Sequence, residues 1–510
     1  MTTTEKSPSV GLRSDRGPVL IALMLCTALV ALDATIIATA VPSIVRDLGG
    51  FSQFPWLFSI YLLTQAVTVP LYGKLADVVG RRPILYFGIA VFLVGSVLCG
   101  VAWSMPSLIA ARAVQGIGAG AVLPISITVV GDLYSVVERS RVQGYLASVW
   151  GVSSVIGPTL GGVFSDYLSW RWIFFINLPL GAVAAWMLWR SFHEKVEHRR
   201  HQLDISGAVL LMSGFSLVIL GLLEGGVAWA WSSVTSYLVF AVGAVTLLTF
   251  LLVERRAAEP VLPLWVFRHR VLLGGNLASV AIGVVVIGMV SYVPMYVQGV
   301  LGTGALVAGF ALAAMTLGWP IAASLSGRLY LRIGFRDTAL IGGVIAVVGT
   351  VLVALLSRTA PVLAVALATF VVGVGLGLSS APAMVAVQSV VDWQRRGVVT
   401  ATNMFCRNLG SAVGVAVFGA VANATLAHRF ADPPAGVAGQ LPSSADAETL
   451  ALGGHAKAGQ VTDFVRGALY AAAHNVFLGV VAAAVVGALV LWLMPRHTQP
   501  VETGEAPAAR

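Results

Sequence analysis

The chain has little charge. Asp, Glu, Lys and Arg make up 10% of its 510 residues, whereas a soluble domain carries about 25%. Hydrophobic residues make up 58% of the chain, and the mean hydropathy is +0.89. These values exclude a soluble domain, with or without a single anchor. They predict an all-α polytopic membrane protein.

Cysteine and nucleotide-binding motifs are also scarce. The three cysteines, Cys26, Cys99 and Cys406, fall in apolar runs and build no disulfide framework. No Gly-x-x-x-x-Gly-Lys-Ser/Thr loop is present, which argues against an ATP-driven pump. No His, Asp and Glu residues converge within the apolar runs, which argues against a membrane enzyme. We therefore expect no metal and no cofactor. No cleavage site follows the first apolar run convincingly, so no cleavable signal peptide is expected.

The net charge of +9 does not indicate nucleic-acid binding, because the bases are spread over many short loops. Such bases instead orient membrane proteins, with basic loops in the cytoplasm. With fourteen spans and both termini inside, most of the 31 Lys and Arg are cytoplasmic, and Arg112 and Arg407 alone fall within spans. The expected spans are 19–41, 54–72, 84–104, 107–130, 140–163, 171–190, 205–224, 234–253, 271–298, 305–325, 338–357, 362–388, 397–423 and 468–494.

A repeated loop predicts a repeated bundle. Residues 73–82, GKLADVVGRR, form a charged stretch between two apolar runs and are expected to make a tight cytoplasmic turn. A degraded copy, GRLYLRIGFR, occurs at residues 327–336, with Leu331 in place of the acid Asp77. We therefore expect two six-helix bundles with pseudo-symmetry plus two extra transmembrane helices. The expected boundaries are 1–203, 204–268 and 269–510, with an external loop at about 427–464.

Five motifs carry a resemblance to a known family. They are the loop at 73–82, LDATIIATAVP at 32–42, RAVQGIG at 112–118, GVSSVIGPTLGG at 151–162 and WRWIFFINLP at 170–179. The chain resembles the fourteen-helix drug/proton antiporters of the major facilitator superfamily, the group similar to EmrB and QacA. The resemblance implies a proton-coupled antiporter that exports lipophilic drugs, expected to be cationic, across the cytoplasmic membrane by alternating access.

Asp33 is the sharpest chemical signal in the residues themselves. It is the one acid well inside an expected span, and an ionised carboxylate in lipid must face a cavity or pair with a base. Burial favours the protonated form of a carboxyl, so that Asp33 can carry the coupling proton. The alternative is a structural acid. Arg112 is expected at a similar depth and is its expected partner, and the resemblance implies a role for Arg112 in proton coupling.

Other residues are predicted to control the conformational change. The resemblance implies that Asp77 interacts with the opposite bundle, where a helix beginning near Arg396 would offer unpaired backbone donors. The small residues and proline at 151–162 favour close helix packing, and the resemblance assigns them to the antiporter motif. The complete set of gating candidates is Gly73, Asp77, Gly80, Arg81, Arg82, Gly151, Gly157, Pro158, Gly161 and Gly162.

Five residues are candidates to line a substrate cavity, with plain structural roles as an equal alternative: Gln115, Trp150, Gln298, Asn403 and Arg407. The expected partners are small lipophilic substrates, protons and the lipid bilayer, with no nucleic acid, and a monomer is expected. The same motifs also fit a dedicated exporter of one endogenous metabolite, lipid or siderophore. A proton-coupled importer shares the fold but is less expected, because the Gly157-Pro158 segment is typical of antiporters.

Overall fold

The computed structural model describes residues 11–49, 56–194, 204–225, 228–257, 260, 264–431 and 460–496. These residues form helices and short connections, and no strand is present among them. The first half contains α1 (Gly17–Leu48), α2 (Trp56–Val79), α3 (Arg81–Gly100), α4 (Met105–Leu133), α5 (Val136–Tyr167), α6 (Trp172–Phe175) and α7 (Asn177–Ser191). Two further helices follow, α8 (Ile205–Glu224) and α9 (Val234–Glu254). The second half contains α10 (Arg270–Met295), α11 (Ala305–Ile333), α12 (Phe335–Ala354), α13 (Val362–Ser389), α14 (Arg396–Ala431) and α16 (Gln460–Val490).

Eleven segments of the described chain are long and apolar enough to cross a membrane. They correspond to α1, α3, α4, α6 with α7, α9, α10, α11, α12, α13, α14 and α16. The three other expected spans fall on α2, α5 and α8, which are 24, 32 and 20 residues long. The sequence-based count of fourteen is therefore not confirmed, whereas an all-helical membrane protein is.

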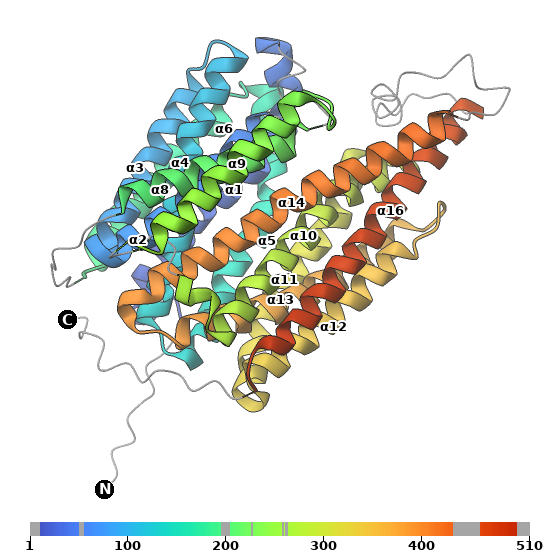
Figure 1. Ribbon diagram of the computed structural model, residues 1–510. Coiled ribbons are helices and arrows are strands. Elements are labelled where there is room, and N and C mark those ends of the chain that lie inside the picture. Colours follow the sequence, from blue (N-terminus) through green and yellow to red (C-terminus); the bar gives the residue numbers. More distant parts are fainter. Residues whose placement is uncertain are drawn as a thin grey trace, which may run out of the picture.

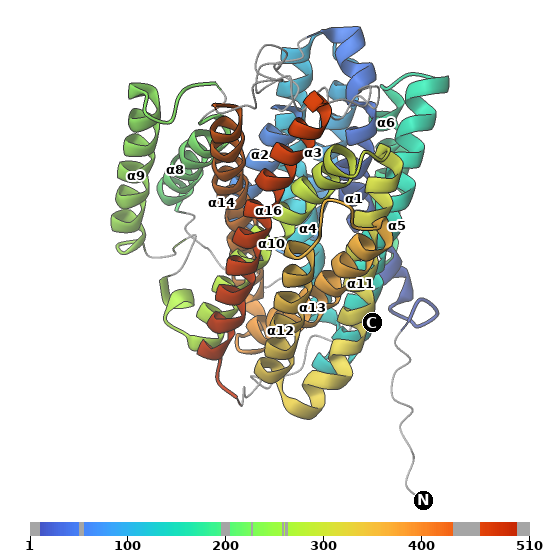
Figure 2. The same cartoon turned by 90° about the vertical axis from the view of Figure 1, so that its right-hand side faces the viewer.

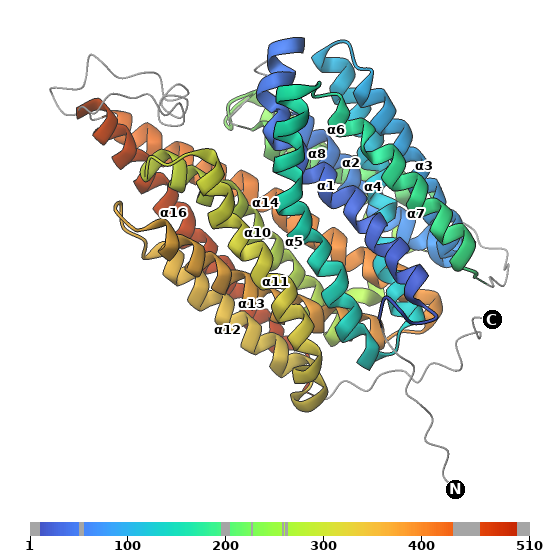
Figure 3. The ribbon, with the colours of Figure 1, turned by 180° about the vertical axis from the view of Figure 1, so that it is seen from behind.

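The helices pack as two bundles that lie side by side (Figure 1). In the first, α1 packs on α5 and α7, and α4 packs on α2 and α3. In the second, α10 packs on α14 and α16, and α13 packs on α11 and α12. The bundles meet through α5 against α11 and through α2 and α4 against α14, as the view from behind also shows for α5 and α11 (Figure 3). Small residues at these crossings allow close helix contact.

The two additional helices lie at one side of the molecule. α8 packs against α9, α2 and α14, and α9 stands outermost (Figure 2). α8 therefore contacts both bundles along one edge of the seam between them. The domain boundaries expected at 203/204 and 268/269 stay predictions, because residues 195–203 and 261–263 lie outside the described ranges.

The charged stretch at 73–82 is more helical than the sequence indicates. α2 continues to Val79 and α3 begins at Arg81, so that the turn consists of Gly80 alone. Gly80 has φ 108°, a conformation that favours glycine. Gly334, with φ 91°, makes the same one-residue connection between α11 and α12. The expectation of a ten-residue turn is wrong, but the two copies adopt matching geometry.

The last two long helices extend beyond their expected spans. α14 continues to Ala431 and α16 begins at Gln460, so that residues 427–431 and 460–464 are helical rather than parts of a loop. The remainder of the expected external loop, residues 432–459, lies outside the described residues. Apolar composition marks the part of a helix suited to lipid, but it does not mark where the helix itself ends.

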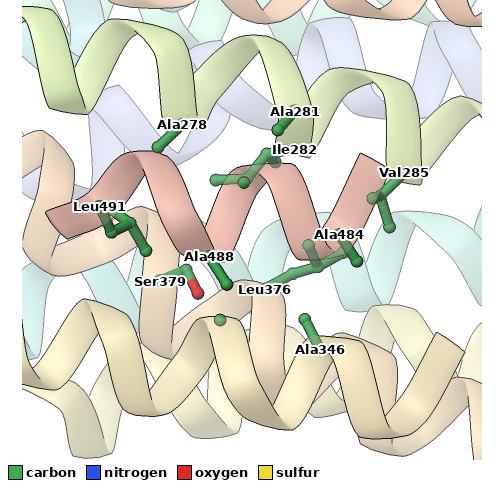
Figure 4. A pocket seen from close by; sticks show the side chains of 12 residues that line it. Ala278, Ala281, Ile282, Val285, Ala346, Leu376, Ser379, Ala484, Ala488 and Leu491 are labelled. Atoms are coloured by element: carbon green, nitrogen blue, oxygen red, sulfur yellow. The ribbon is translucent and has the colours of Figure 1, made fainter. Parts of the chain in front are cut away.

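A small pocket lies inside the second bundle. It has a volume of about 20 Å³ and is lined mainly by alanine, glycine and leucine-type side chains of α10, α12, α13 and α16 (Figure 4). Ala278, Ala281 and Ala484 are among these residues. A pocket of this size holds no more than about one water, so it is a packing defect and not a drug site.

Candidate functional site

Five helices of the first bundle bring polar side chains together around Asp33. We call this group the Asp33 cluster; it consists of Asp33 on α1, Tyr61 on α2, Ser96 on α3, Arg112 and Gln115 on α4, and Asn177 at the start of α7. Asp33 and Arg112 are each 1% exposed. Because an isolated charge in a membrane protein is costly, the cluster must satisfy both charges internally.

The Asp33 carboxylate is fully engaged. Its Oδ2 accepts a hydrogen bond from Arg112 Nη1 at 2.6 Å, which is also an ion pair. Its Oδ1 accepts from Gln115 Nε2 at 2.7 Å and from Asn177 Nδ2 at 3.3 Å. The sequence predicted similar depths for Asp33 and Arg112, and the structure places them in direct contact. The pair is neutral as a whole, which lowers the cost of burying it.

Arg112 is held on its other sides as well. Its Nε donates to the carbonyl of Leu57 at 3.1 Å, and its Nη1 donates to Gln115 Oε1 at 2.6 Å. The Tyr61 ring lies 4.1 Å from the guanidinium carbon, within the range of a cation–π contact. The Tyr61 ring is therefore occupied by Arg112 in this structure.

Glycines permit the close helix approach that forms the cluster. A Cβ on Gly116 would lie 2.5 Å from the carbonyl oxygen of Tyr61, so α4 and α2 touch there backbone to backbone. A Cβ on Gly95 would lie 2.6 Å from Gln115 Cα, so α3 approaches α4 beside Ser96. Small residues thus position the polar ones, because a larger side chain at either place would separate the helices.

A second group of charges joins the two bundles at one end. We call this the basic end; Arg81 and Arg82 begin α3 there and Arg396 begins α14. Asp77, in the last turn of α2, accepts hydrogen bonds from the backbone N–H groups of Gly397 at 3.1 Å and Val398 at 2.8 Å. The start of α14 has unpaired donors and the positive end of a helix dipole, both of which favour a carboxylate.

Gly73 allows this contact. A Cβ on Gly73 would lie 2.3 Å from Ala401 Cβ and 2.9 Å from the carbonyl oxygen of Gly397. α2 and α14 therefore cross at a distance that only glycine permits, one turn from Asp77. The contact is between bundles, so it holds them together at the basic end.

Arg81 connects Asp77 to a second acid that the sequence reading missed. The Arg81 guanidinium pairs with Asp77 at 2.7 Å and with Asp132, near the end of α4, at 3.0 Å. Asp132 also pairs with Arg396 at 3.4 Å. Arg81 further donates to the carbonyl of Trp393 at 2.8 Å and lies 4.1 Å from its ring. We call these five residues the gate cluster. Asp132 directly follows the expected span 107–130, and this position at the end of an apolar span was the signal that could have identified it.

Arg82 has a different role from Arg81. The backbone N–H groups of Arg81 and Arg82 donate to the carboxylate of Glu194 at 3.1 and 2.9 Å. Glu194 thereby caps the first turn of α3, where four N–H groups lack helical partners. The Arg82 side chain donates to the carbonyl of Trp189 at 3.3 Å. These contacts stay within the first bundle, so Arg82 does not join the gate cluster.

The glycine-rich part of α5 packs on two sides. A Cβ on Gly157 would lie 2.8 Å from Thr35 Cβ on α1, and the Thr35 hydroxyl donates to the carbonyl of Ser153 at 3.0 Å. Gly151 faces Leu317 and Pro320 of α11 in the other bundle. Gly161 is buried, whereas the side-chain positions of Pro158 and Gly162 lie outside the described residues. This segment therefore links the helix of Asp33 to the opposite bundle.

The cavity candidates do not share one environment. Gln115 belongs to the Asp33 cluster and has no exposed surface. Asn403 is 4% exposed and bonds to Ser279, Gly275 and Asn276 on α10, so it joins two helices. Trp150 is 37% exposed on α5, and Gln298 lies in the π-helical turn Tyr296–Val300 after α10. Arg407 is partly exposed in the middle of α14. In this structure neither Gln115 nor Asn403 offers surface to a substrate.

Metal binding has no support in the described part of the chain. No group of three His, Cys, Asp or Glu side chains there could hold a metal ion. The three cysteines are buried and unpaired.

Comparison with known proteins gives a consistent result. The sequence profile of the Major Facilitator Superfamily matches residues 23–415. The chain is 35% identical over 448 residues to "Multidrug resistance protein 3" of Bacillus subtilis, covering 87% of this chain and 86% of that protein. It is 33% identical to "Multidrug transporter protein MdtP" of the same organism, covering 88% and 83%. The crystal structure of the human organic anion transporter MFSD10 (TETRAN) has a similar fold, with a TM-score of 0.60 and 16% identity over 92% of this chain and 99% of that chain.

Proposed function

The chain belongs to the Major Facilitator Superfamily, a family of membrane transporters, and we propose that it is a proton-coupled antiporter that exports lipophilic drugs. The buried Asp33–Arg112 pair is the observation that carries this proposal. Relatives with at least 30% identity are named as drug transporters and efflux pumps, which supports the direction of transport. The family is not enzymatic, and no catalytic step is proposed.

We infer proton coupling from the contacts of the Asp33 cluster. Asp33 is the one acidic residue of the described chain that lies in the interior of a long helix, far from both ends. A protonated Asp33 would lose its ion pair with Arg112, so a proton and the Arg112 guanidinium compete for the same carboxylate. Two polar atoms in the cluster, Tyr61 Oη and Asn177 Oδ1, are buried without a partner among the described residues. Asn177 Oδ1 would accept a hydrogen bond from a neutral Asp33 carboxyl after a flip of the Asn177 amide, which now presents Nδ2 to Asp33.

We infer alternating access from the contacts of the gate cluster. The hydrogen bonds that cross between bundles gather at the basic end: Gly397 and Val398 to Asp77, Arg396 to Gly131 and Tyr330 to Val136. With these contacts formed, the basic end is closed. Rocking of one bundle against the other would break them and open that end. Asp33 is only 1% exposed in the closed arrangement, so we propose that it exchanges its proton in a later step.

The α5 segment gives a physical path between the Asp33 cluster and the second bundle. Gly157 packs against Thr35, which lies within one turn of Asp33 on α1. Gly151 and Gly144 on the same helix contact α11 of the other bundle. Movement of α11 during rocking would therefore shift α5 and, through it, the part of α1 that carries Asp33.

Localisation and the remaining span count complete the proposal. We propose fourteen spans, with α2, α5 and α8 added to the eleven segments above, in the cytoplasmic membrane. The basic end faces the cytoplasm, because basic loops stay on that side, and both termini are cytoplasmic. A monomer is proposed, since the two bundles of one chain form the complete set of gate contacts.

Single cysteines should report this orientation. Trp103, between α3 and α4, is 81% exposed at the end opposite the basic end, and Gln394 is exposed at the basic end. A membrane-impermeant maleimide applied to intact cells should label Trp103→Cys, and it should label Gln394→Cys only after permeabilisation. The native cysteines are buried and give a low background. The reverse pattern would contradict the orientation.

The export function is tested by a resistance and efflux panel on cells that express the protein. We expect efflux of several lipophilic compounds that a protonophore abolishes. A panel in which one endogenous metabolite, lipid or siderophore is exported and no drug is would favour the dedicated exporter instead. Net uptake down the proton gradient would indicate an importer and refute the proposal.

A further inference from the structure

Arg407 is a charged side chain in the interior of α14 that lacks a partner. No charged group of the described residues acts on its guanidinium, and it has no hydrogen bond, ion pair or ring contact among them. The other interior arginine, Arg112, has four partners by contrast. An ionisable residue inside a membrane-spanning helix that is left unpaired by the protein is a candidate for a binding role.

The position of Arg407 excludes a simple surface role. It follows Arg396, the first residue of α14, by eleven residues, or about 16 Å along the helix axis. That depth exceeds the reach of an arginine side chain towards the basic end, so snorkelling does not account for it. Burial of a single unpaired cation at this depth is costly unless an anion joins it.

Arg407 lies on the face of α14 that carries gate contacts at its start. Residues 396, 400 and 407 share one helix face by their spacing. Arg396 donates to the carbonyl of Gly131 on α4, and Thr400 accepts from Gln388, which also donates to the carbonyl of Ile127 on α4. Two turns further from the basic end, the backbone carbonyl of Arg407 packs against Gly283 of α10, and the residue is partly exposed. Arg407 therefore lies beyond the closed gate, beside α10 of its own bundle.

A second unused donor lies next to Asn403, which precedes Arg407 by one turn of α14. Asn403 donates to Asn276 Oδ1 on α10. The Asn276 Nδ2 group is buried and has no acceptor among the described residues. Buried polar groups are normally paired, so this unused amide donor also needs an explanation. Neither the Arg407 guanidinium nor Asn276 Nδ2 has a hydrogen-bond acceptor among the described residues.

No free carboxylate balances these donors. Asp33 is engaged with Arg112, Gln115 and Asn177 and is 1% exposed. The other acidic residues that the structure describes lie at helix ends or in connections. A cationic substrate would thus find no open acid at this depth, whereas an anion would find a guanidinium whose planar donors match carboxylate and phosphate oxygens.

We propose that Arg407 forms an anion-binding subsite of the substrate route, which takes the carboxylate, phosphate or sulfonate of a lipophilic compound. The inference rests on the proposed export function and specifies its substrate class. It replaces the expectation of a cationic substrate with that of an anionic or zwitterionic one.

A pair of dyes that differ in one charge tests this subsite. The probes are a cationic rhodamine methyl ester and its free acid, and binding to purified full-length protein is followed by fluorescence polarisation without a proton gradient. The parent should bind the acid more tightly than the ester. Arg407→Ala should weaken binding of the acid by at least about tenfold, the size of one charge-assisted hydrogen bond, and leave the ester unchanged.

Two variants control for folding and for charge in general. Arg407→Lys keeps the charge and should retain part of the preference for the acid. Arg429→Ala removes a charge from an exposed position on the same helix and should change neither affinity. Equal losses for both dyes in Arg407→Ala, or no loss for the acid, would overturn the subsite.

The outcomes separate this inference from the proposed function. Export of both dyes from cells without a charge preference would remove the subsite but leave the exporter. Charge-selective binding without export would support the subsite but refute the exporter. Competition by short-chain phosphatidylglycerol, tested against phosphatidylcholine, identifies the source of the anion: displacement of the acid by the former alone, lost in Arg407→Ala, assigns the subsite to a lipid headgroup rather than a drug.

Discussion

Replacement of Asp33 by Asn is expected to abolish uphill export driven by a proton gradient. Asparagine has nearly the same shape but cannot take up or release a proton. If Asp33 carries the coupling proton, the variant should also lose substrate-induced proton release from purified protein, while downhill exchange of substrate persists. A loss of at least about tenfold in gradient-driven efflux is expected, because proton transfer by a positioned group is not replaced by solvent in a buried site.

The structure shows why this variant needs controls. In Asp33→Asn the Arg112 guanidinium would remain buried without its anion, which typically costs about 3–5 kcal/mol of stability. The double variant Asp33→Asn with Arg112→Gln removes both charges and should recover stability without recovering coupling. Asp47→Asn provides a matched control on the same helix, because Asp47 is exposed and its contact with Arg171 is long, at 3.7 Å. The amide oxygen of the variant can still accept the hydrogen bond that Trp170 Nε1 donates to Asp47 at 2.9 Å. Proton release from Asp33→Asn equal to that of the parent would show that another group carries the coupling.

Arg112 offers an independent readout of the same assignment. Removal of a neighbouring positive charge favours the protonated form of a carboxyl. Arg112→Ala should therefore change the pH dependence of transport, because the Asp33 carboxylate loses its ion-pair partner. Arg112→Lys should shift the profile less but still reduce transport, since an ammonium cannot reproduce the contacts to Asp33, Gln115 and the Leu57 carbonyl together.

Asp77→Asn is expected to produce the second largest effect, a loss of the state in which the basic end is closed. The carboxylate accepts two backbone N–H groups of α14 and pairs with Arg81. An amide can accept these hydrogen bonds only with its one oxygen, and it loses the attraction to the helix dipole and to the guanidinium. Transport should fall several-fold, whereas expression and substrate binding should remain.

Spin labels across the gate measure this shift. Arg141 on α5 and Gln394 before α14 are exposed and belong to different bundles, so labels at these positions report their separation. In Asp77→Asn the distance distribution should move to longer values. Asp337→Asn is the matched control, because Asp337 stands at the corresponding connection of the second half and pairs with Arg336 and Arg496 within its own bundle. An unchanged distribution in Asp77→Asn would remove the latch from the mechanism.

The sequence alone determined the class of protein and the position of its key charges along the helices. Hydropathy and loop charge are properties of short sequence segments, and membrane insertion depends on them segment by segment. The helices therefore lie close to the apolar runs. The span positions show that Asp33 is the one acid well inside an expected span. The helix rise per residue then places Arg112 at a similar depth. The donors at the start of α14 follow from helix geometry, whereas it was the family resemblance that directed Asp77 to the opposite bundle.

Tertiary structure alone decided which side chains meet. Ser96 and Asn177 join Asp33 from helices that are distant in the sequence, and the crossings that bring them there depend on backbone contacts at Gly95 and Gly116. The pairing of Asp132 with Arg81 and Arg396 requires three helix ends to converge from both bundles. The isolation of Arg407 is likewise invisible in the sequence, because whether a charge has a partner depends on what every neighbouring helix places beside it.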